Sequence, residues 1–409
     1  RCEHQIAEQM LRVARFVGAF RHDGGGEPDA RNKTRGTLPR LLEKHPEFAL
    51  WANRTGETLL HRAVAAEHPE AVWRLLELGA DPNARDAVGR TPLFRSLGSP
   101  YWGPGASPER SCAQLLLDAG ADIHAVDNEG NTLLHAAATM SAAGKAETLV
   151  AMGLDPTAGN AAGQTPLHLV YELEPPSVTE ALARAGAPLD ARDNQGRTPL
   201  HAAVTAGYNW GGWSLLALEP PVDAADNDGL QPLHLAVAQW TRPEWWRDVS
   251  ACYSADMVRT LVSRGADISA TDNAGNTPLH HAAMANAVPA ARYLIEQGVR
   301  LDPRNDARQT PLHFASERGC AAMVRRLIDA GASLHTRDAE GRTPLHCAAT
   351  ADYPDAVKVI LRKARSSDLP RLRRARDKAG RTPLDCARQA GHAPATRALE
   401  AAGRLQAAR

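Results

Sequence analysis

The sequence has little of what catalysis, membrane insertion or a disulfide framework requires. Of its 409 residues, six are cysteine, none in a C-x-x-C pair, and 5% are aromatic. The 47 basic residues balance the 47 acidic ones, which disfavours a globally basic nucleic-acid binder. No apolar run is long enough to span a bilayer, and no secretory signal opens the chain. We therefore expect a cytoplasmic protein, of the producing cell or of a host if it is secreted, without membrane insertion.

The motifs of common enzyme classes are missing as well. The sequence contains no G-x-S-x-G, no P-loop, no G-x-G-x-x-G and no H-E-x-x-H. The glycine triplet 24–26 precedes neither a strand nor a lysine-bearing helix, so it indicates a linker and not a phosphate cradle. We expect no catalytic residues, no cofactor and no metal site. An enzyme would need a polar pocket in the long loops, which offer mainly Trp, Arg and Asp.

What the sequence does contain is an internal repeat with a period of 33 residues, typified by the stretch from Gly196 to Ala203. Internal repeats decide the architecture before any other pattern does. Each copy predicts a tight turn, a first helix, a short loop and a second helix. Ten copies of the pattern start at Thr58, Thr91, Thr132, Thr165, Thr198, Gln231, Thr277, Thr310, Thr343 and Thr382.

The residues of one copy suit this arrangement. Thr198 is placed to accept from the free N–H groups of a helix start, and Pro199 fits the first helical position. Small and apolar residues follow, so that neighbouring helices can approach closely. A glycine then ends the second helix in most copies by taking the left-handed conformation, as expected for Gly120, Gly186, Gly265 and Gly331.

This T-P-L-H-x-A core at a period of 33 resembles the ankyrin repeat family. The resemblance covers roughly residues 53 to 403 and implies an all-α solenoid of about ten helix-turn-helix repeats with hairpin-like turns. It implies a stack stabilised by contacts between neighbouring repeats, and a concave face that binds partner proteins. The chain departs from the pattern locally, with Leu59 and Leu133 for Pro, Phe94 and Asp385 for His, and Arg308 for the turn Gly.

The two ends of the chain are predicted to cap the stack. Apolar residues at Ile6, Met10, Val13, Val17 and Phe20 lay one stripe along a helix, which would cover the first repeat or dock a partner. Residues 21–37 are expected to form a flexible linker within an N-terminal capping region, 1–52. The solenoid would then occupy 53–409, ending in a polar capping helix.

Three intervals between copies are stretched. The insertions fall near 99–107, 240–252 and 365–370, and insertions in solenoids often lie on the binding face. Five of the eight tryptophans fall in two neighbouring copies, where the rings either pack on their own repeats or anchor a partner. The candidate aromatic contacts are Tyr208, Trp210, Trp213, Trp240, Trp245, Trp246 and Tyr253.

Polar turn tips and a basic segment offer two further candidate surfaces. By the resemblance, tip residues contact the partner, although any solenoid has solvated tips; among them are Arg192, Asn194, Arg197, Asn227 and Asp228. Eleven basic residues stand against three acidic ones between 358 and 388. This segment could attract an acidic protein segment or, less well without aromatic rings, nucleic acid. Its centre is Arg371, Arg373, Arg374 and Arg376.

Histidine occupies the same slot in eight copies. The resemblance implies that this side chain bonds to backbone of its own turn and of the next repeat. A metal site would need converging ligands, whereas these residues are spread one per layer. Cys347 and Cys386 share a slot in adjacent copies, too far apart for a disulfide, which favours reduced thiols.

Together these patterns predict a non-catalytic protein-protein interaction module, monomeric or in a hetero-complex. Its partner would be another protein, bound by the concave face and the aromatic loop. The richness in Ala, Arg and Pro favours a bacterial source and, weakly, an effector, adaptor or toxin-neutralising role. The alternative is a binder of nucleic acid or acidic surfaces through residues 358–388.

Overall fold

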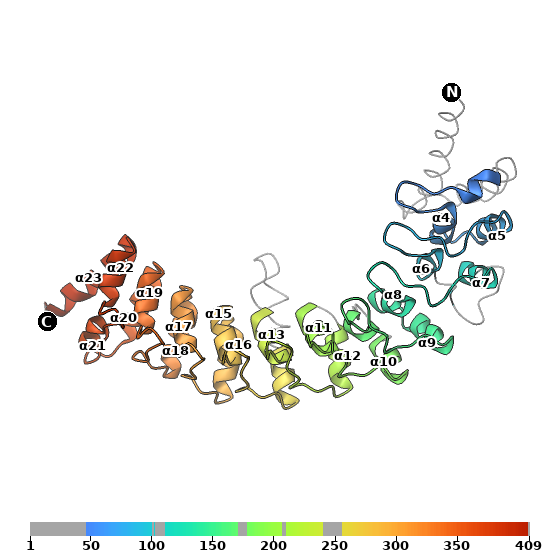
Figure 1. The fold of residues 1–409 in the computed structure, drawn as a ribbon. Coiled ribbons are helices and arrows are strands. Elements are labelled where there is room, and N and C mark those ends of the chain that lie inside the picture. The colour runs from blue at the N-terminus through green and yellow to red at the C-terminus, as the bar shows by residue number, and fades with distance from the viewer. Residues whose placement is uncertain are drawn as a thin grey trace, which may run out of the picture. The chain divides into compact units, whose positions relative to one another are not determined.

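The computed structural model describes residues 46–99, 102, 111–170, 178–206, 210–239 and 256–407. Among these residues every regular element is a helix, and one isolated bridge joins Ala52 to Thr58. The chain divides into unit 1 (residues 1–194 and 209–218) and unit 2 (195–208 and 219–409). Helices of each unit form two rows, with the first helix of each repeat in one and the second in the other (Figure 1). The predicted all-α solenoid is thus confirmed for the described residues.

Unit 1 contains the N-terminal repeats. Its 3-10 helix η2 (Pro46–Leu50) precedes the first repeat. The first helices are α4 (Leu59–Ala65), α6 (Pro92–Ser96), α8 (Leu133–Thr139) and the 3-10 helix η4 (Pro166–Leu169). The second helices are α5 (Pro69–Glu77), α7 (Cys112–Asp118), α9 (Ala143–Ala151), α10 (Val178–Arg184) and α12 (Trp210–Ala217). First helices pack beside one another in two pairs, α4 with α6 and α8 with η4.

Unit 2 contains the C-terminal repeats and follows the same plan. Its first helices are α11 (Pro199–Ala206), α13 (Pro232–Ala238), α15 (Pro278–Met284), α17 (Pro311–Glu317), α19 (Pro344–Thr350) and α22 (Pro383–Gln389). Its second helices are residues 256–263, α16 (Val288–Glu296), α18 (Ala321–Ala330), α20 (Pro354–Lys363) and α23 (Ala393–Ala407). A short additional helix, α21 (Leu369–Arg374), lies between α20 and α22.

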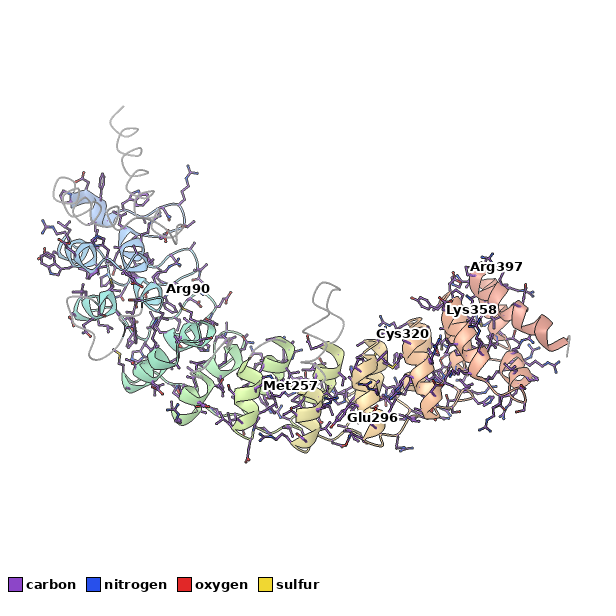
Figure 2. The ribbon with its side chains drawn as sticks, turned by 180° about the vertical axis from the view of Figure 1, so that it is seen from behind. Arg90, Met257, Glu296, Cys320, Lys358 and Arg397 are labelled. Carbon is purple, nitrogen blue, oxygen red and sulfur yellow. The ribbon has the colours of Figure 1, made fainter. Side chains whose placement is uncertain are left out.

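The core of each unit runs along its stack, between the two rows of helices. The leucine of each T-P-L-H motif is buried, as Leu279 and Leu312 are, and small residues after the histidine, such as Ala282 and Ala283, are buried as well and let the helices lie close. Because each layer buries its apolar face only against its neighbours, stability accumulates from layer to layer. Charged side chains also pair between second helices: Arg326 of α18 donates to Glu296 of α16 at 3.5 Å. Figure 2 labels Glu296 on α16.

The hairpin turns are tied together by backbone bonds, one from each turn to the turn before it. In unit 1 the Asn128 N–H donates to the Val88 carbonyl (2.9 Å), and in unit 2 the Ala339 N–H donates to the Ala307 carbonyl (2.8 Å). Each turn is also closed by an acidic or amide side chain at its start. Asp338 Oδ1, for example, accepts from the N–H groups of Glu340 (3.0 Å) and Arg342 (2.7 Å).

Glycines act where the sequence predicted them to. Gly120, Gly186, Gly265 and Gly331 follow second helices with φ between 86° and 107°, so the predicted left-handed helix ends are confirmed. Arg308, which replaces the turn glycine, keeps that conformation with a φ of 57°, and its corner is not distorted.

The structure describes the three predicted insertions to different extents. Residues 365–370 form a turn and the start of α21, whose Leu372 is buried and fixes the helix against the stack. The insertion near 99–107 is described only at Ser99 and Trp102, and the insertion at 240–252 lies outside the described residues, as do the predicted linker and N-terminal helix. The division at residue 52 into cap and solenoid stays a prediction.

Candidate interaction surface

The T-P-L-H histidine joins each repeat to the next. The Thr58 N–H donates to His61 Nδ1 at 3.2 Å, so this nitrogen must be an acceptor. His61 Nε2 lies 2.9 Å from the Arg90 carbonyl, so it must carry the proton and donate. The same two bonds recur for other histidines in the slot, namely His135, His201, His280, His313 and His346. His234 Nδ1 accepts in the same way from the Gln231 N–H, but its Nε2 lies 3.2 Å from a different carbonyl, that of Ala270.

This pattern confirms the structural role that the resemblance implied. In a neutral imidazole with Nδ1 accepting and Nε2 donating, neither nitrogen has a lone pair left for a metal ion. No group of three or more metal-binding side chains gathers in the described parts of the chain. A helix-start contact of the predicted kind is present at Thr58, whose Oγ1 accepts from the His61 N–H at 3.3 Å.

Burial keeps these histidines neutral. It lowers the pKa of His280 and of His313 from 6.5 to about 4, against the opposing effect of the bond to the next carbonyl. Burial also lowers the pKa of His61, His135 and His346. Protonation would place a second N–H on Nδ1, opposite the backbone N–H of Thr, so acid breaks the contact at each layer.

The two departures at this slot have physical reasons. Asp385, in the last copy of the sequence, accepts from the Thr382 N–H (2.9 Å) and hydroxyl (2.7 Å) through Oδ2, which reproduces the Nδ1 half of the motif. Asp385 is exposed, so no donor is needed on its other side. Phe94 offers no acceptor, and the buried hydroxyl of Thr91 has no hydrogen-bond partner.

The described part of the chain contains four of the six cysteines. Cys112, Cys320, Cys347 and Cys386 are free thiols, which agrees with the predicted reduced state. Burial raises the pKa of Cys112 and of Cys347 to about 12, so both stay protonated and unreactive at neutral pH.

A second row of side chains stands directly after the histidine of each copy, and we call this position the x slot. In unit 2 three consecutive copies hold Leu235, His281 and Phe314 there, all half-buried. Ring contacts join this row to the T-P-L-H histidine of the preceding copy. His281 lies edge-on to His234 of the preceding copy at 5.2 Å between centroids, and Phe314 lies edge-on to His280 at 5.9 Å. The x slot before this stretch is Ala202, and those after it are the buried Cys347 and Cys386.

His281 in the middle of this row is held by a carboxylate. Its Nε2 lies 2.9 Å from Asp272 Oδ2, while Asp272 Oδ1 accepts from the Asn276 N–H at 2.8 Å. Burial would raise the pKa of Asp272, but these hydrogen bonds outweigh burial and lower it. The imidazole is therefore fixed in orientation while one edge of it stays on the surface. With Met284, one turn further along α15 and also half-buried, the row forms a mixed apolar and aromatic surface.

The predicted aromatic contacts fall mostly outside this description. Tyr208, Trp240, Trp245, Trp246 and Tyr253 are not among the described residues. Trp210 begins α12 and Trp213 lies half-buried on the same helix, in unit 1. In the other insertion Trp102 is half-buried, and its indole N–H donates to Ser96 Oγ at 2.7 Å, so this ring packs on its own repeat.

The predicted tip residues take part in the turn framework. Asn194 Nδ2 donates to the Ala161 carbonyl at 3.0 Å, and the Asn227 N–H donates to the Gln195 carbonyl at 2.9 Å. Arg197 lies 3.6 Å from the buried Asp226. Arg192 and Asp228 are exposed. These residues thus have structural contacts of their own, and their contact with a partner stays a prediction.

The predicted basic segment lies on α20, α21 and the following turn. Its acidic neighbours already have partners: Asp355 pairs with Lys358, Asp368 lies 3.8 Å from His335, and Asp377 pairs with Arg381. Arg371, Arg374 and Arg376 are exposed, and Arg373 is half-buried. Figure 2 shows Lys358 on α20 and Arg397 on α23 at this end of unit 2.

Sequence reasoning missed the x-slot row of unit 2. The signal was present, because Leu, His and Phe follow the histidine in three successive copies where Ala or Cys stands on either side.

Comparison with known proteins agrees with this geometry. A family model of three ankyrin repeats matches residues 249–338 and 323–404, and a model of a single ankyrin repeat matches residues 55–87. Neurogenic locus notch homolog protein 2 of Homo sapiens is 32% identical over 157 residues, covering 32% of this chain and 6% of that protein. Neurogenic locus Notch protein of Drosophila melanogaster is 30% identical over 141 residues, covering 34% of this chain and 5% of that protein.

The chain thus spans only about a twentieth of the length of the curated relatives it matches. The repeat spacing, the bonded histidines and both family models lead to one conclusion: the chain is an ankyrin repeat protein. Ankyrin repeats indicate a protein-protein interaction module, and neither matching model is a catalytic family. No helix among the described residues has the length and apolar character needed to cross a membrane.

Proposed function

We propose that this chain is a non-catalytic module that binds a partner protein through the first-helix face of unit 2. The observation that carries the proposal is the x-slot row of Leu235, His281 and Phe314. Half-buried apolar and aromatic side chains on three adjacent helices bury more area in a complex than the alanine and cysteine slots around them. Because the helices are stacked and His281 is fixed by Asp272, little ordering is needed on binding.

The tryptophan-rich insertion is proposed as a second anchor of the same interface. It begins directly after α13, whose x-slot residue is Leu235. Trp245 and Trp246 would extend the contact, and the exposed tip at Asp228 would contribute polar contacts at the edge. An adaptor, effector or toxin-neutralising role in the cytoplasm, as a monomer or in a hetero-complex, fits such a module.

Affinity capture from the native host tests this proposal. The bait is the full chain in three forms: wild type, Leu235→Ala plus Phe314→Ala, and Trp245→Ala plus Trp246→Ala. Truncating an interface anchor costs about 2 kcal/mol or more, which weakens binding roughly thirtyfold. A partner retained by the wild type should therefore be lost with the first double variant, and with the second if the insertion takes part.

The matched control is Tyr293→Ala plus Ile295→Ala. These residues are a half-buried aromatic and aliphatic pair on α16, in the second-helix row of the same unit. This control should retain the partner. If it loses the partner to the same degree, or if Leu235→Ala plus Phe314→Ala loses nothing while its helical circular dichroism is intact, the first-helix face is not the binding surface.

A further inference from the structure

Three arginines in equivalent positions line consecutive hairpin turns of unit 2. Arg304, Arg337 and Arg376 each directly precede the residue that starts the turn, Asn305, Asp338 and Asp377 respectively. All three are exposed. We call this set the arginine row. It lies on the turns, separate from the x-slot row on the helices, and it adjoins the basic helix α21.

The guanidinium groups of Arg337 and Arg376 are positioned by backbone carbonyls. Arg337 Nη1 donates to the Gly341 carbonyl at 3.0 Å and also to the carbonyl of Arg376 on the next turn. Arg376 Nη1 donates to the Gly380 carbonyl at 2.5 Å. A guanidinium has five N–H donors, so each group keeps donors for a ligand after it has been oriented. Orientation before binding lowers the ordering cost of an ionic contact.

The acids that start these turns do not neutralise the row. Asp338 Oδ2 accepts from Arg342 Nε at 2.8 Å, and Asp377 Oδ2 accepts from Arg381 Nε at 2.9 Å. Asn305 carries no charge. The other acids of the three turns are Asp306 and Glu340, both exposed at the tips.

The charge of the turns also changes along unit 2. Residues 303–309, 336–342 and 375–381 hold seven basic and four acidic side chains, whereas residues 224–230 and 270–276 hold three acidic and no basic ones. Exposed Arg371 and Arg374 on α21 extend the basic end. The positive charge is thus concentrated on the last turns of this unit.

We propose that the arginine row binds an extended acidic segment of a protein. Stacked helices lie about 8–10 Å apart, so consecutive arginines are separated by one such layer. A chain in the extended polyproline II conformation advances about 3.1 Å per residue with three residues per turn, so carboxylates at every third position lie on one side and match that spacing. Arginine forms paired bonds to carboxylates, which favours acidic side chains over a diffuse negative field. Nucleic acid is disfavoured because no Phe, Trp or Tyr follows Tyr353 to stack on bases.

The test measures binding of synthetic peptides to the full chain by fluorescence anisotropy. One peptide carries Glu at every third position over nine residues, and a second has the same composition with the three Glu adjacent. Single-stranded DNA with an equal number of charges is the third probe. We expect the spaced peptide to bind at least fivefold more tightly than the clustered peptide and the DNA, with an affinity that falls as salt rises.

Two charge-matched triple variants decide where the peptide binds. Arg304→Gln, Arg337→Gln and Arg376→Gln together should weaken the spaced peptide at least tenfold. The control triple variant changes the exposed Arg300, Arg318 and Arg325 to Gln, with the same loss of net charge, and should change binding less than twofold. Equal weakening by both variants, indifference to Glu spacing, or equally tight DNA binding would each overturn the proposal.

The change at Arg337 also removes its hydrogen bonds to the Gly341 and Arg376 carbonyls, which could destabilise the turns. Thermal unfolding of each variant is therefore measured together with binding. A further triple variant to Lys keeps the charge but lacks the planar fork. It should recover part of the affinity lost with Gln. A Lys variant that binds no better than the Gln variant, although it unfolds at the wild-type temperature, would contradict an ionic contact.

Discussion

Acid should unfold unit 2 in a pH range set by its bonded histidines. The perturbation is a change from pH 7 to pH 5. The folded pKa of His280 and of His313 is about 4, below the unfolded value of 6.5. A group with a lowered folded pKa stabilises the fold fully above the unfolded pKa, and this contribution is lost as pH falls from 6.5 towards 4.

The magnitude follows from these two values. At pH 5 nearly every unfolded molecule binds a proton at such a histidine, whereas few folded molecules do. This difference lowers the free energy of unfolding by about 2 kcal/mol per residue relative to pH 7. His280 and His313 together therefore remove about 4 kcal/mol, and His234 and His346, whose pKa burial also lowers, act in the same direction. Domains are stable by about 5–15 kcal/mol, so this loss is large.

Urea unfolding followed by circular dichroism at pH 8, 7, 6 and 5 measures the effect. Stability should be nearly level between pH 8 and 7 and should fall by 4 kcal/mol or more by pH 5 (about 2 kcal/mol for each of two residues). In His313→Gln the fall between pH 7 and 5 should shrink by about 2 kcal/mol, although the variant is less stable at pH 7. A stability that is equal at pH 7 and 5, or imidazole NMR titrations of His280 and His313 centred near 6.5, would refute the reasoning.

Three further predictions concern single side chains. Thr91→Val should stabilise the protein by about 1 kcal/mol, because the buried hydroxyl of Thr91 has no partner, whereas Thr310→Val, which removes a 2.8 Å contact to His313 Nδ1, should destabilise it by a similar amount in urea unfolding. If both variants shift stability in the same direction, the unpaired hydroxyl is not the cause. Arg308→Gly should raise stability by about 1 kcal/mol by removing a side chain from a φ of 57°. Gly275→Ala should lower it, since the added Cβ would lie 3.0 Å from Asp306 Oδ1, and a stabilising Gly275→Ala would contradict this account of the turns.

The repeat made most of the fold predictable from the sequence. Because the pattern occurs ten times, aligning the copies shows which position of the repeat each residue occupies. The roles of Thr198, Pro199 and the helix-ending glycines could therefore be predicted from the sequence. The hydrogen-bonding role of the histidines was predicted by resemblance, and the two bonds at His61 explain it chemically. What one copy could not show is the pairing between copies.

Contacts between layers depend on two residues that are 29 positions apart. Asn160 Nδ2 donates to Asn131 Oδ1, and Asn305 Nδ2 donates to Asn276 Oδ1, both at 2.8 Å. An amide can serve as donor and acceptor, so an Asn before the Thr of one copy suits an Asn at the turn start of the next. The binding surface was harder to predict than these contacts, because the exposure of an x-slot side chain depends on which side chains fill the neighbouring layers.

The Asp385 motif also gives the stack a direction. In each bonded histidine the Nε2–H group donates to a backbone carbonyl of the following copy. Asp385 has no such donor, because a carboxylate can only accept. Tandem duplication of the segment that starts at Thr382 would set this carboxylate against a main-chain oxygen, two groups that repel. Lengthening the array by copying its final module would therefore fail unless residue 385 were first changed to histidine.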